Sequence, residues 1–417
     1  MAGEHWYRIE LEGRHVGYMY HRSHQHRDGR WIFESTTHFL LQNNSPNTIS
    51  KKLFFAAEYP NPLTEARYTN AKGDSTVIQA QPTLASSPYQ ASVKRGQHTT
   101  TLPLDWSFTL ADFLAFESWL VTAQPPAGEW FNVQDPDFEK LRIAQRRYEV
   151  IGHNELGYVV QTQALLAPTV TQLDHRYRPM NLSMAGVFKI DRTSQVHAVA
   201  IQEMQRKTSY VFEVDQRLSD HTRLDSLDLR THNAANALPA TLSLVRGTAA
   251  TDADPGLFIG EELDYPVSHR RIQNIVQKAL GAGTTDTLAQ RLLSAAHDAL
   301  QYAEDNPAGG VLRALDRGFG ECTDFADLLT TLARASQIPA RTVFGLAYRD
   351  GSRPGFMYHA WNELYLDDRW VPMDPTWNQT QVDATHIPLS DQQSAAIMLA
   401  HARAPIRFEV LEATYGD

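Results

Sequence analysis

Apolar residues occupy every second position in much of the first half of the chain. The alternation spans residues 7–11 and resumes at 16–20, and Glu12-Gly13-Arg14 between them can form a turn. This period of two predicts a β-hairpin. Asp28-Gly29 offers another tight turn before a strand-like segment at 31–41. Comparable strand-like segments follow at residues 51–58, 75–81, 141–151, 156–164, 187–191 and 196–201.

One helix is predicted within this β-rich region. Thr109 and Asp112 have the spacing of a capping box, and apolar residues from Leu110 to Leu120 share one helical face. We therefore predict a β-rich N-terminal domain at residues 1–230, with a weaker boundary near residue 128. The polar, turn-rich stretch 231–256 is predicted to link it to a C-terminal domain at 257–417.

In the C-terminal domain, helical spacing replaces alternation. Phe325, Leu328, Leu329 and Leu332 recur at intervals of three and four residues, and Ile338-Pro339 ends the pattern. The spacing predicts a helix that begins near residue 322. Earlier helices are predicted at 285–302 and 311–317 and a later one at 391–401, with strands at 340–346, 359–366, 370–373 and 406–411.

Composition and charge narrow the class of protein. The hydrophobic fraction of 42% and the charged fraction of 21% are those of a globular protein. The net charge of −10 argues against a polyanionic partner such as nucleic acid. No run of 18 or more apolar residues is present, so no membrane-spanning segment is predicted in this chain.

The compartment stays open at this stage. The first residues contain neither a charged stretch nor an apolar stretch typical of a signal peptide. A trimmed leader or anchor would make the protein periplasmic or secreted, and otherwise it is cytoplasmic. The single cysteine fits either compartment.

That single cysteine, Cys322, is the strongest candidate for chemistry. It cannot form an internal disulfide or a cysteine-rich metal cluster, so it is a buried inert thiol or a nucleophile. Its predicted place at the start of a helix favours the nucleophile, because unpaired N–H groups and the helix dipole stabilise a thiolate there. Gly320 would allow the chain to turn sharply into this position.

Two downstream residues complete a plausible catalytic group. His359 begins a predicted strand, and Asp374 ends another before a proline. A thiol nucleophile needs a base within hydrogen-bond reach, and the base needs a third group that orients its ring. The competing interpretations are an ordinary half-buried strand histidine and a turn aspartate.

Four sequence motifs in this order resemble the core of the transglutaminase-like, papain-related superfamily in its bacterial form. The motifs are Gly320-Glu321-Cys322-Thr323-Asp324-Phe325-Ala326, Ile338-Pro339-Ala340-Arg341, His359-Ala360-Trp361-Asn362-Glu363 and Asp374-Pro375-Thr376-Trp377. The resemblance covers roughly residues 285–390. It implies an α+β catalytic domain with Cys322, His359 and Asp374 as the triad.

The aromatic residues near the triad have two interpretations. Trp361, Trp377 and Tyr358 could contact the substrate, or they could belong to the core, where large aromatic residues are more common. No metal site and no cofactor are predicted. His24 and His26 would share a strand face, but no third ligand is evident beside them.

The sequence therefore predicts cysteine-dependent acyl transfer on an amide bond through a thioester. Hydrolysis of a peptide or amide is favoured because water is always available. Protein-glutamine transamidation and a non-catalytic binding module remain alternatives. The expected partner is a protein or peptide, with a cell-wall peptide as one hypothesis that rests only on the size of the β-rich domain.

Overall fold

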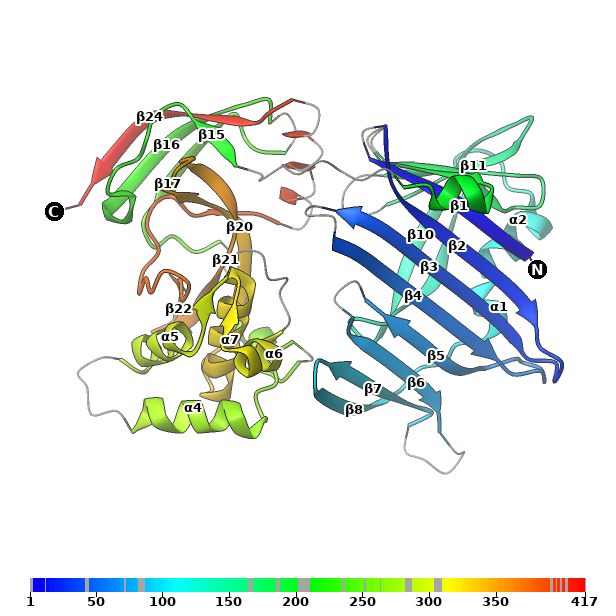
Figure 1. Cartoon of the computed structure of the whole chain (residues 1–417), viewed down its shortest axis with the longest axis horizontal. Helices are drawn as coiled ribbons and strands as arrows, with labels where there is room; N and C mark the ends of the chain where they lie inside the picture. Colours follow the sequence, from blue (N-terminus) through cyan, green and yellow to red (C-terminus); the bar gives the residue numbers. More distant parts are fainter. Residues whose placement is uncertain are drawn as a thin grey trace. The chain divides into compact units, whose positions relative to one another are not determined.

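A computed structural model describes most of the chain. The described residues are 3–11, 13–41, 45–70, 73–81, 87–163, 168–184, 188–201, 211–234, 237–250, 253–262, 264–281, 287–303, 310–390, 393–394, 396–397, 400–401 and 404–416. The chain divides into two compact units, Met1–Lys207 and Thr208–Asp417 (Figure 1). Each unit is described by itself below.

The first unit is built on one antiparallel sheet, which has 14 strands among the described residues. Two runs of consecutive strands, β1 to β8 and β9 to β14, are joined where β1 pairs with β14. The predicted first hairpin is confirmed by the β1–β2 pair. The strands are β1 (Gly3–Leu11), β2 (Arg14–Gln25), β3 (Trp31–Leu41), β4 (Ser45–Phe55), β5 (Leu63–Thr69), β6 (Ser75–Ala80), β7 (Tyr89–Arg95), β8 (His98–Leu104), β9 (Trp130–Asp137), β10 (Arg142–Asn154), β11 (Gly157–Thr162), β12 (Thr169–Leu173), β13 (Pro179–Met184) and β14 (Phe188–Thr193).

Short helices interrupt this sheet in the sequence. The predicted capping box is confirmed, because the Asp112 amide donates to Thr109 Oγ1 and the Thr109 amide donates to Asp112 Oδ2. The single predicted helix is instead two, α1 (Leu110–Phe113) and α2 (Ala115–Ala123), which meet at Leu114. Buried residues of α1 and α2 complete the apolar core against the sheet.

One predicted strand of this unit is wrong. Within 196–201 the chain forms the helix α3 (Gln195–Val199), with Ser194 as the N-cap whose hydroxyl accepts the His197 amide. Alternation of small and apolar residues over such a short segment does not separate a strand from one helical turn, and the cap decides. Residues 164 and 187, at the ends of two other predicted strands, lie outside the described residues.

The second unit combines a second sheet with α-helices at residues 270–335, which lie in the sequence between strands of that sheet. The sheet order is β17-β16-β24-β15-β21-β20-β23, and β22 also pairs with β21. The elements are β15 (Phe212–Val214), β16 (Leu224–His232), β17 (Thr241–Val245), α4 (Arg270–Leu280), α5 (Leu288–Ala299), β18 (Gln301–Tyr302), α6 (Val311–Arg317), β19 (Phe319–Gly320), α7 (Cys322–Ala335), β20 (Ala340–Arg349), β21 (Gly355–Leu366), β22 (Arg369–Met373), β23 (Ile387–Pro388), β24 (Arg407–Tyr415) and two 3-10 turns, His221–Arg223 and Pro255–Phe258.

The stretch 231–256, predicted as a linker, contains β17 and the end of β16. Leu242 and Leu244 alternate along β17 and pack against the apolar cluster that includes Leu227 and Leu229. The first unit ends earlier, at Lys207. Several residues of this stretch, and several of the predicted helix 391–401, lie outside the described residues.

The helix α7 lies at the centre of the second unit. Its predicted apolar residues Phe325, Leu328, Leu329 and Leu332 are all buried, in a cluster with residues of α4, α5, α6 and the sheet. The predicted strands after α7 are confirmed as β20, β21 and β22. Asn362 of β21 ties the sheet to the helix, because its Nδ2 donates to the Ala326 carbonyl at 2.7 Å. The start of α7 is thereby held against β21.

Among the described residues, no helix is both long enough and apolar enough to cross a membrane.

Candidate active site

Cys322 is the first residue of α7, and its side chain is partly exposed. Glu321 and Asp324 form a capping box at this end of the helix, with the Glu321 amide donating to Asp324 Oδ2 at 3.2 Å. This arrangement fixes the direction in which the chain enters the helix. The thiol therefore lies where the helix dipole favours negative charge, as the sequence pattern predicted.

Gly320 is required for this approach. A Cβ atom built at residue 320 would lie 2.6 Å from Asp324 Cβ and 2.8 Å from Asp324 Oδ2. Contacts this short cannot form without displacing Asp324, which caps the helix. The turn into Cys322 is tight because of packing against the cap.

We expect Gly320→Ala to destabilise the protein by about 1–3 kcal/mol, because the added methyl group overlaps Asp324. Denaturant unfolding followed by circular dichroism measures the change. Gly260→Ala is the matched control, since a Cβ there meets nothing within 4 Å. Equal stability of the two variants would show that Asp324 moves aside without cost.

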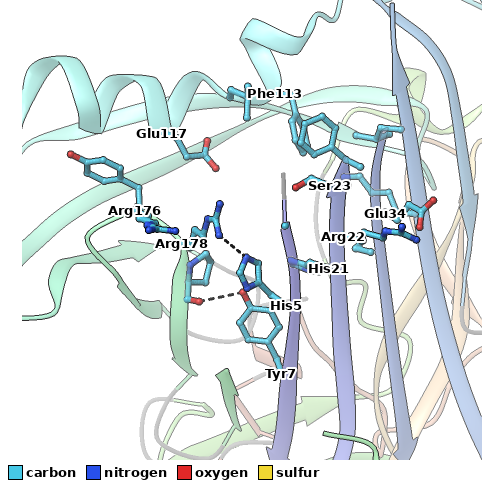
Figure 2. A pocket seen from close by; sticks show the side chains of 18 of the residues that line it. His5, Tyr7, His21, Arg22, Ser23, Glu34, Phe113, Glu117, Arg176 and Arg178 are labelled. Atoms are coloured by element: carbon cyan, nitrogen blue, oxygen red, sulfur yellow. Dashed lines mark hydrogen bonds between the residues drawn. The ribbon is translucent and has the colours of Figure 1, made fainter. Parts of the chain in front are cut away.

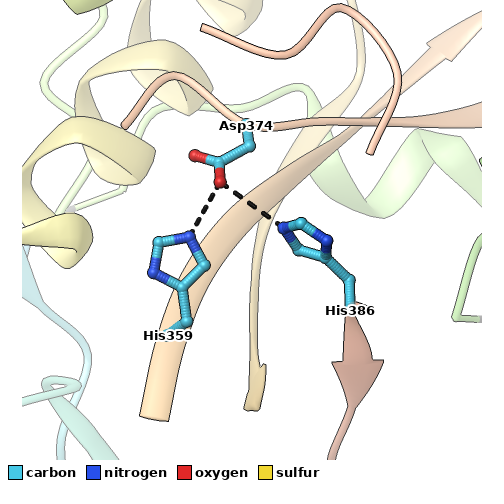
Figure 3. A group of neighbouring side chains, drawn as sticks. All are labelled: His359, Asp374 and His386. Carbon is cyan, nitrogen blue, oxygen red and sulfur yellow. Dashed lines mark hydrogen bonds and ion pairs between the residues drawn. The ribbon is translucent and has the colours of Figure 1, made fainter. Parts of the chain in front are cut away.

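His359 lies on β21 and is buried. Its Nε2–H donates to Asp374 Oδ2 at 2.8 Å (Figure 3). This bond leaves Nδ1 as the ring nitrogen available to Cys322, which is close enough to influence the pKa of His359. Burial alone would lower the pKa of His359, but the charges and hydrogen bonds of Asp374 and then Cys322 raise it to about 10. The ring is therefore held as an imidazolium at neutral pH.

Asp374 directly follows the short strand β22 and is fully buried. Its Oδ1 accepts the backbone amide of Thr376 at 2.8 Å, and its Oδ2 accepts His359. Burial would raise the pKa of this carboxyl, but the His359 charge and hydrogen bonds from two histidines hold it well below its usual range. The carboxylate is thus ionised and directed at His359.

A second histidine, His386, shares this carboxylate and was not identified from the sequence. Its Nε2 lies 3.5 Å from Asp374 Oδ2, and its Nδ1 lies 3.3 Å from Asp383 Oδ1. Burial would lower the pKa of His386, but hydrogen bonds to both carboxylates raise it. With 17 histidines in the chain and no recognisable spacing around this one, only the fold brings it to the site.

His359, Asp374 and His386 together offer ligand atoms within 4.8 Å of one another, which is close enough to consider a metal ion (Figure 3). Two ligands of a tetrahedral Zn²⁺ lie roughly 3.3 Å apart, given Zn–N and Zn–O bonds of about 2.0 Å. The His359–Asp374 separation of 2.8 Å is shorter and fits a direct hydrogen bond. We therefore interpret the cluster as hydrogen-bonded.

The three aromatic residues predicted to contact substrate have different surroundings. Trp377 stacks on the His359 ring, with centroids 4.2 Å apart and planes 9° apart. Trp361 is only 2% exposed and belongs to a small apolar cluster. Tyr358 precedes His359 on the strand and donates its hydroxyl hydrogen to the Ser394 carbonyl at 3.1 Å. Only Trp377 directly covers a face of the His359 ring.

Two further residues lie near the site, and no sequence pattern predicted their place there. Tyr302 is 47% exposed and stands opposite Gly320 in the β18–β19 pair. Burial, followed by the nearby charge of Cys322, raises the pKa of Tyr302. His297 of α5 donates its Nδ1–H to the Pro375 carbonyl at 2.8 Å, and this bond supports the turn after Asp374.

Comparison with known proteins identifies the domain. Residues 273–375 match the family model of the transglutaminase-like superfamily, so this part of the chain is a transglutaminase-like domain. The matched range includes Cys322, His359 and Asp374. A search of curated proteins finds no significant match.

Several solved structures show weaker similarity. A candidate cysteine protease from Cytophaga hutchinsonii is 18% identical with a TM-score of 0.27, and the match covers 43% of this chain and 61% of that chain, less than two thirds of its length. A beta-barrel-like protein with a domain of unknown function from Brucella abortus is 8% identical, with a TM-score of 0.31 and coverage of 46% and 94%. A candidate protease from Parabacteroides distasonis is 10% identical, with a TM-score of 0.20 and coverage of 88% and 70%.

Proposed function

We propose that the second unit is a papain-related α+β cysteine enzyme that hydrolyses a peptide or amide bond through a thioester. The observation that carries this proposal is the Asp374–His359 hydrogen bond, with Cys322 beside this pair at the start of α7. The three groups match the orienter, base and nucleophile that thiol catalysis needs. A binding module would have no chemical use for this arrangement.

The proposed reaction begins with attack by the Cys322 thiolate on the substrate carbonyl carbon. A carbon–sulfur bond forms, and the carbonyl oxygen becomes an oxyanion. The backbone N–H of Cys322, at the helix N-terminus, is suited to donate to this oxygen. Collapse of the intermediate breaks the carbon–nitrogen bond, and the amine leaves with the proton from His359.

The thioester is then resolved by a second attack. His359, now neutral, accepts a proton from the attacking water, and the sulfur leaves as the thiolate when the acid is released. Asp374 supports both halves, because its charge stabilises the imidazolium each time it forms. Trp377 stacked on the ring adds a cation–π contact to the same form.

Hydrolysis and transamidation share the acyl-enzyme and differ only in the attacking group. The test offers the enzyme a glutamine-containing peptide and a peptide amide, each with and without a fluorescent primary amine. We expect free acid as the main product in all four mixtures, with Cys322→Ala as the blank. Fluorescent product in excess of free acid would assign the enzyme to the transglutaminases instead.

A further inference from the structure

The first unit contains a cavity of about 790 Å³ that the proposed chemistry does not use. Its lining comes from β1 to β4, from α1 and α2, and from residues 176–179 (Figure 2). This volume lies within the roughly 300–1,000 Å³ typical of small-molecule sites. The lining has two chemically distinct parts, a polar row on the sheet and an apolar wall.

The polar row crosses four neighbouring strands. His5 pairs with His21, His21 pairs with Ser35, and Ser35 pairs with Lys51 in the strand register. Residues directly opposite each other in antiparallel strands point to the same face. All four line the cavity, so the row forms part of its wall.

Lys51 is the unusual member of this row. It lies on β4, two and four positions before the buried Leu53 and Phe55, so its side chain points to the core face of an interior strand. Among the described residues, its ammonium group has no hydrogen bond or salt bridge. Its nearest ring contact is Phe138, at 5.1 Å from the centroid. Burial lowers the pKa of Lys51, which agrees with a position away from bulk water.

Lys51 is half-buried, and an amino group in such a position favours an anionic partner, because withdrawing a charge from water without one is costly. Ser35 and His21, next along the row, can donate hydrogen bonds to the same anion. Burial lowers the pKa of His21 to about 4, so it is neutral at pH 7 and adds no charge of its own. The row thus offers one cation and two polar neighbours.

The apolar wall lies beside this row. Phe33 and Leu53 form the neighbouring cross-strand pair on the same face of the sheet. The centroid of the Phe33 ring lies 4.5 Å from that of Phe113, at the end of α1. Leu114 and Val121, which also line the cavity, extend this surface along α2. A surface of this kind accommodates a hydrocarbon chain and excludes water from it.

We propose that this cavity binds an anionic amphiphile, with its acyl chain against Phe33, Leu53 and Phe113 and its carboxylate or phosphate headgroup on Lys51. The proposal combines an inward-facing cation that forms no salt bridge among the described residues with an adjoining apolar surface. The nearby Asp135 carboxylate is already paired with Arg146. It concerns the first unit only and does not depend on the chemistry at Cys322.

Of the other ionisable groups of the cavity, Glu34 forms a salt bridge with Lys52, and the groups below are compatible with this ligand. Arg178 donates to His5 Nε2 at 3.1 Å, which keeps the His5 ring neutral and adds positive charge at the far end of the row (Figure 2). Glu117 faces the cavity from α2, and desolvation raises its pKa. Arg176 adds a further positive charge to the lining.

Displacement of the fluorescent fatty acid dansylaminoundecanoic acid from the full chain tests the proposal. We expect saturable binding and displacement by straight-chain fatty acids, with affinity rising about fourfold per added methylene until the cavity is full. A parallel series of alkyl phosphates distinguishes the two headgroups. The series that binds more tightly identifies whether the site takes a carboxylate or a phosphate. Absence of saturable probe binding would overturn the proposal.

Lys51→Met tests the assigned headgroup contact. It should weaken binding of the fatty carboxylate at least 10-fold, because a charge-assisted hydrogen bond is lost, and leave binding of the alcohol of equal chain length unchanged. Lys189→Met, at an exposed position on β14 outside the cavity lining, is the matched control. Equal carboxylate affinity of the Lys51 and Lys189 variants would refute the assignment.

A second variant tests the acyl site without touching the core. Ser118→Trp places a large ring into the cavity from an exposed position on α2 and should abolish binding of both the acid and the alcohol. Thermal unfolding verifies that each variant is folded. Retention of acid and alcohol binding by folded Ser118→Trp would place the chain elsewhere and contradict the proposal. Cys322→Ala should bind the probe like the unaltered chain.

Discussion

Replacing Cys322 with alanine is expected to reduce turnover of any amide substrate by roughly 10⁴-fold or more, because no other side chain can form the acyl-enzyme. The measurement is steady-state hydrolysis of a peptide amide by the full chain and by the variant. Stability should change little, since the side chain is partly exposed at the first turn of α7. Thermal unfolding provides that check.

The single cysteine makes a direct control available. Iodoacetamide can add only one group per chain to a thiol, so intact mass spectrometry counts reacted Cys322 without mapping. Alkylation should abolish turnover in proportion to the modified fraction. Full activity of the completely alkylated enzyme, or of Cys322→Ala, would contradict the assigned nucleophile.

Asp374→Asn is expected to separate the charge of the carboxylate from its hydrogen bond. Asparagine can keep an oxygen near His359 Nε2, but it removes the charge that raises the pKa of His359 to about 10. We expect turnover to fall roughly 10- to 100-fold, the cost of a charge-assisted hydrogen bond. In Asp374→Ala, which removes both the charge and the hydrogen bond, turnover should fall roughly 10³-fold.

The raised pKa of His359 predicts how stability and activity change with pH. A histidine whose pKa is raised on folding contributes stability that is fully present below its unfolded value of 6.5 and is lost as pH rises through about 10. Activity that needs the imidazolium should therefore persist into the alkaline range and decline near pH 10. In Asp374→Asn the alkaline limb should move to lower pH, because burial then dominates. An unmoved limb would show that Asp374 does not control the base.

Local sequence patterns predicted helices and strands correctly where one physical factor dominates. The helix α7 was predictable because four apolar residues at helical spacing all enter one core cluster. The β1–β2 hairpin was predictable because its alternation and turn agree. At 196–201 a short alternation competed with a serine cap, and the cap determined a helix. β17 was not predicted because its two leucines lie in an otherwise polar stretch.

The sequence by itself determined the order of the Cys322, His359 and Asp374 motifs and the start of a helix at Cys322, since both depend on local spacing and backbone geometry. Only the tertiary structure decided that His386 shares the Asp374 carboxylate. It also decided that Lys51 faces a cavity beside Phe33 and Leu53. The reason is that pairing between distant segments depends on strand register and packing, which no local pattern of residues encodes.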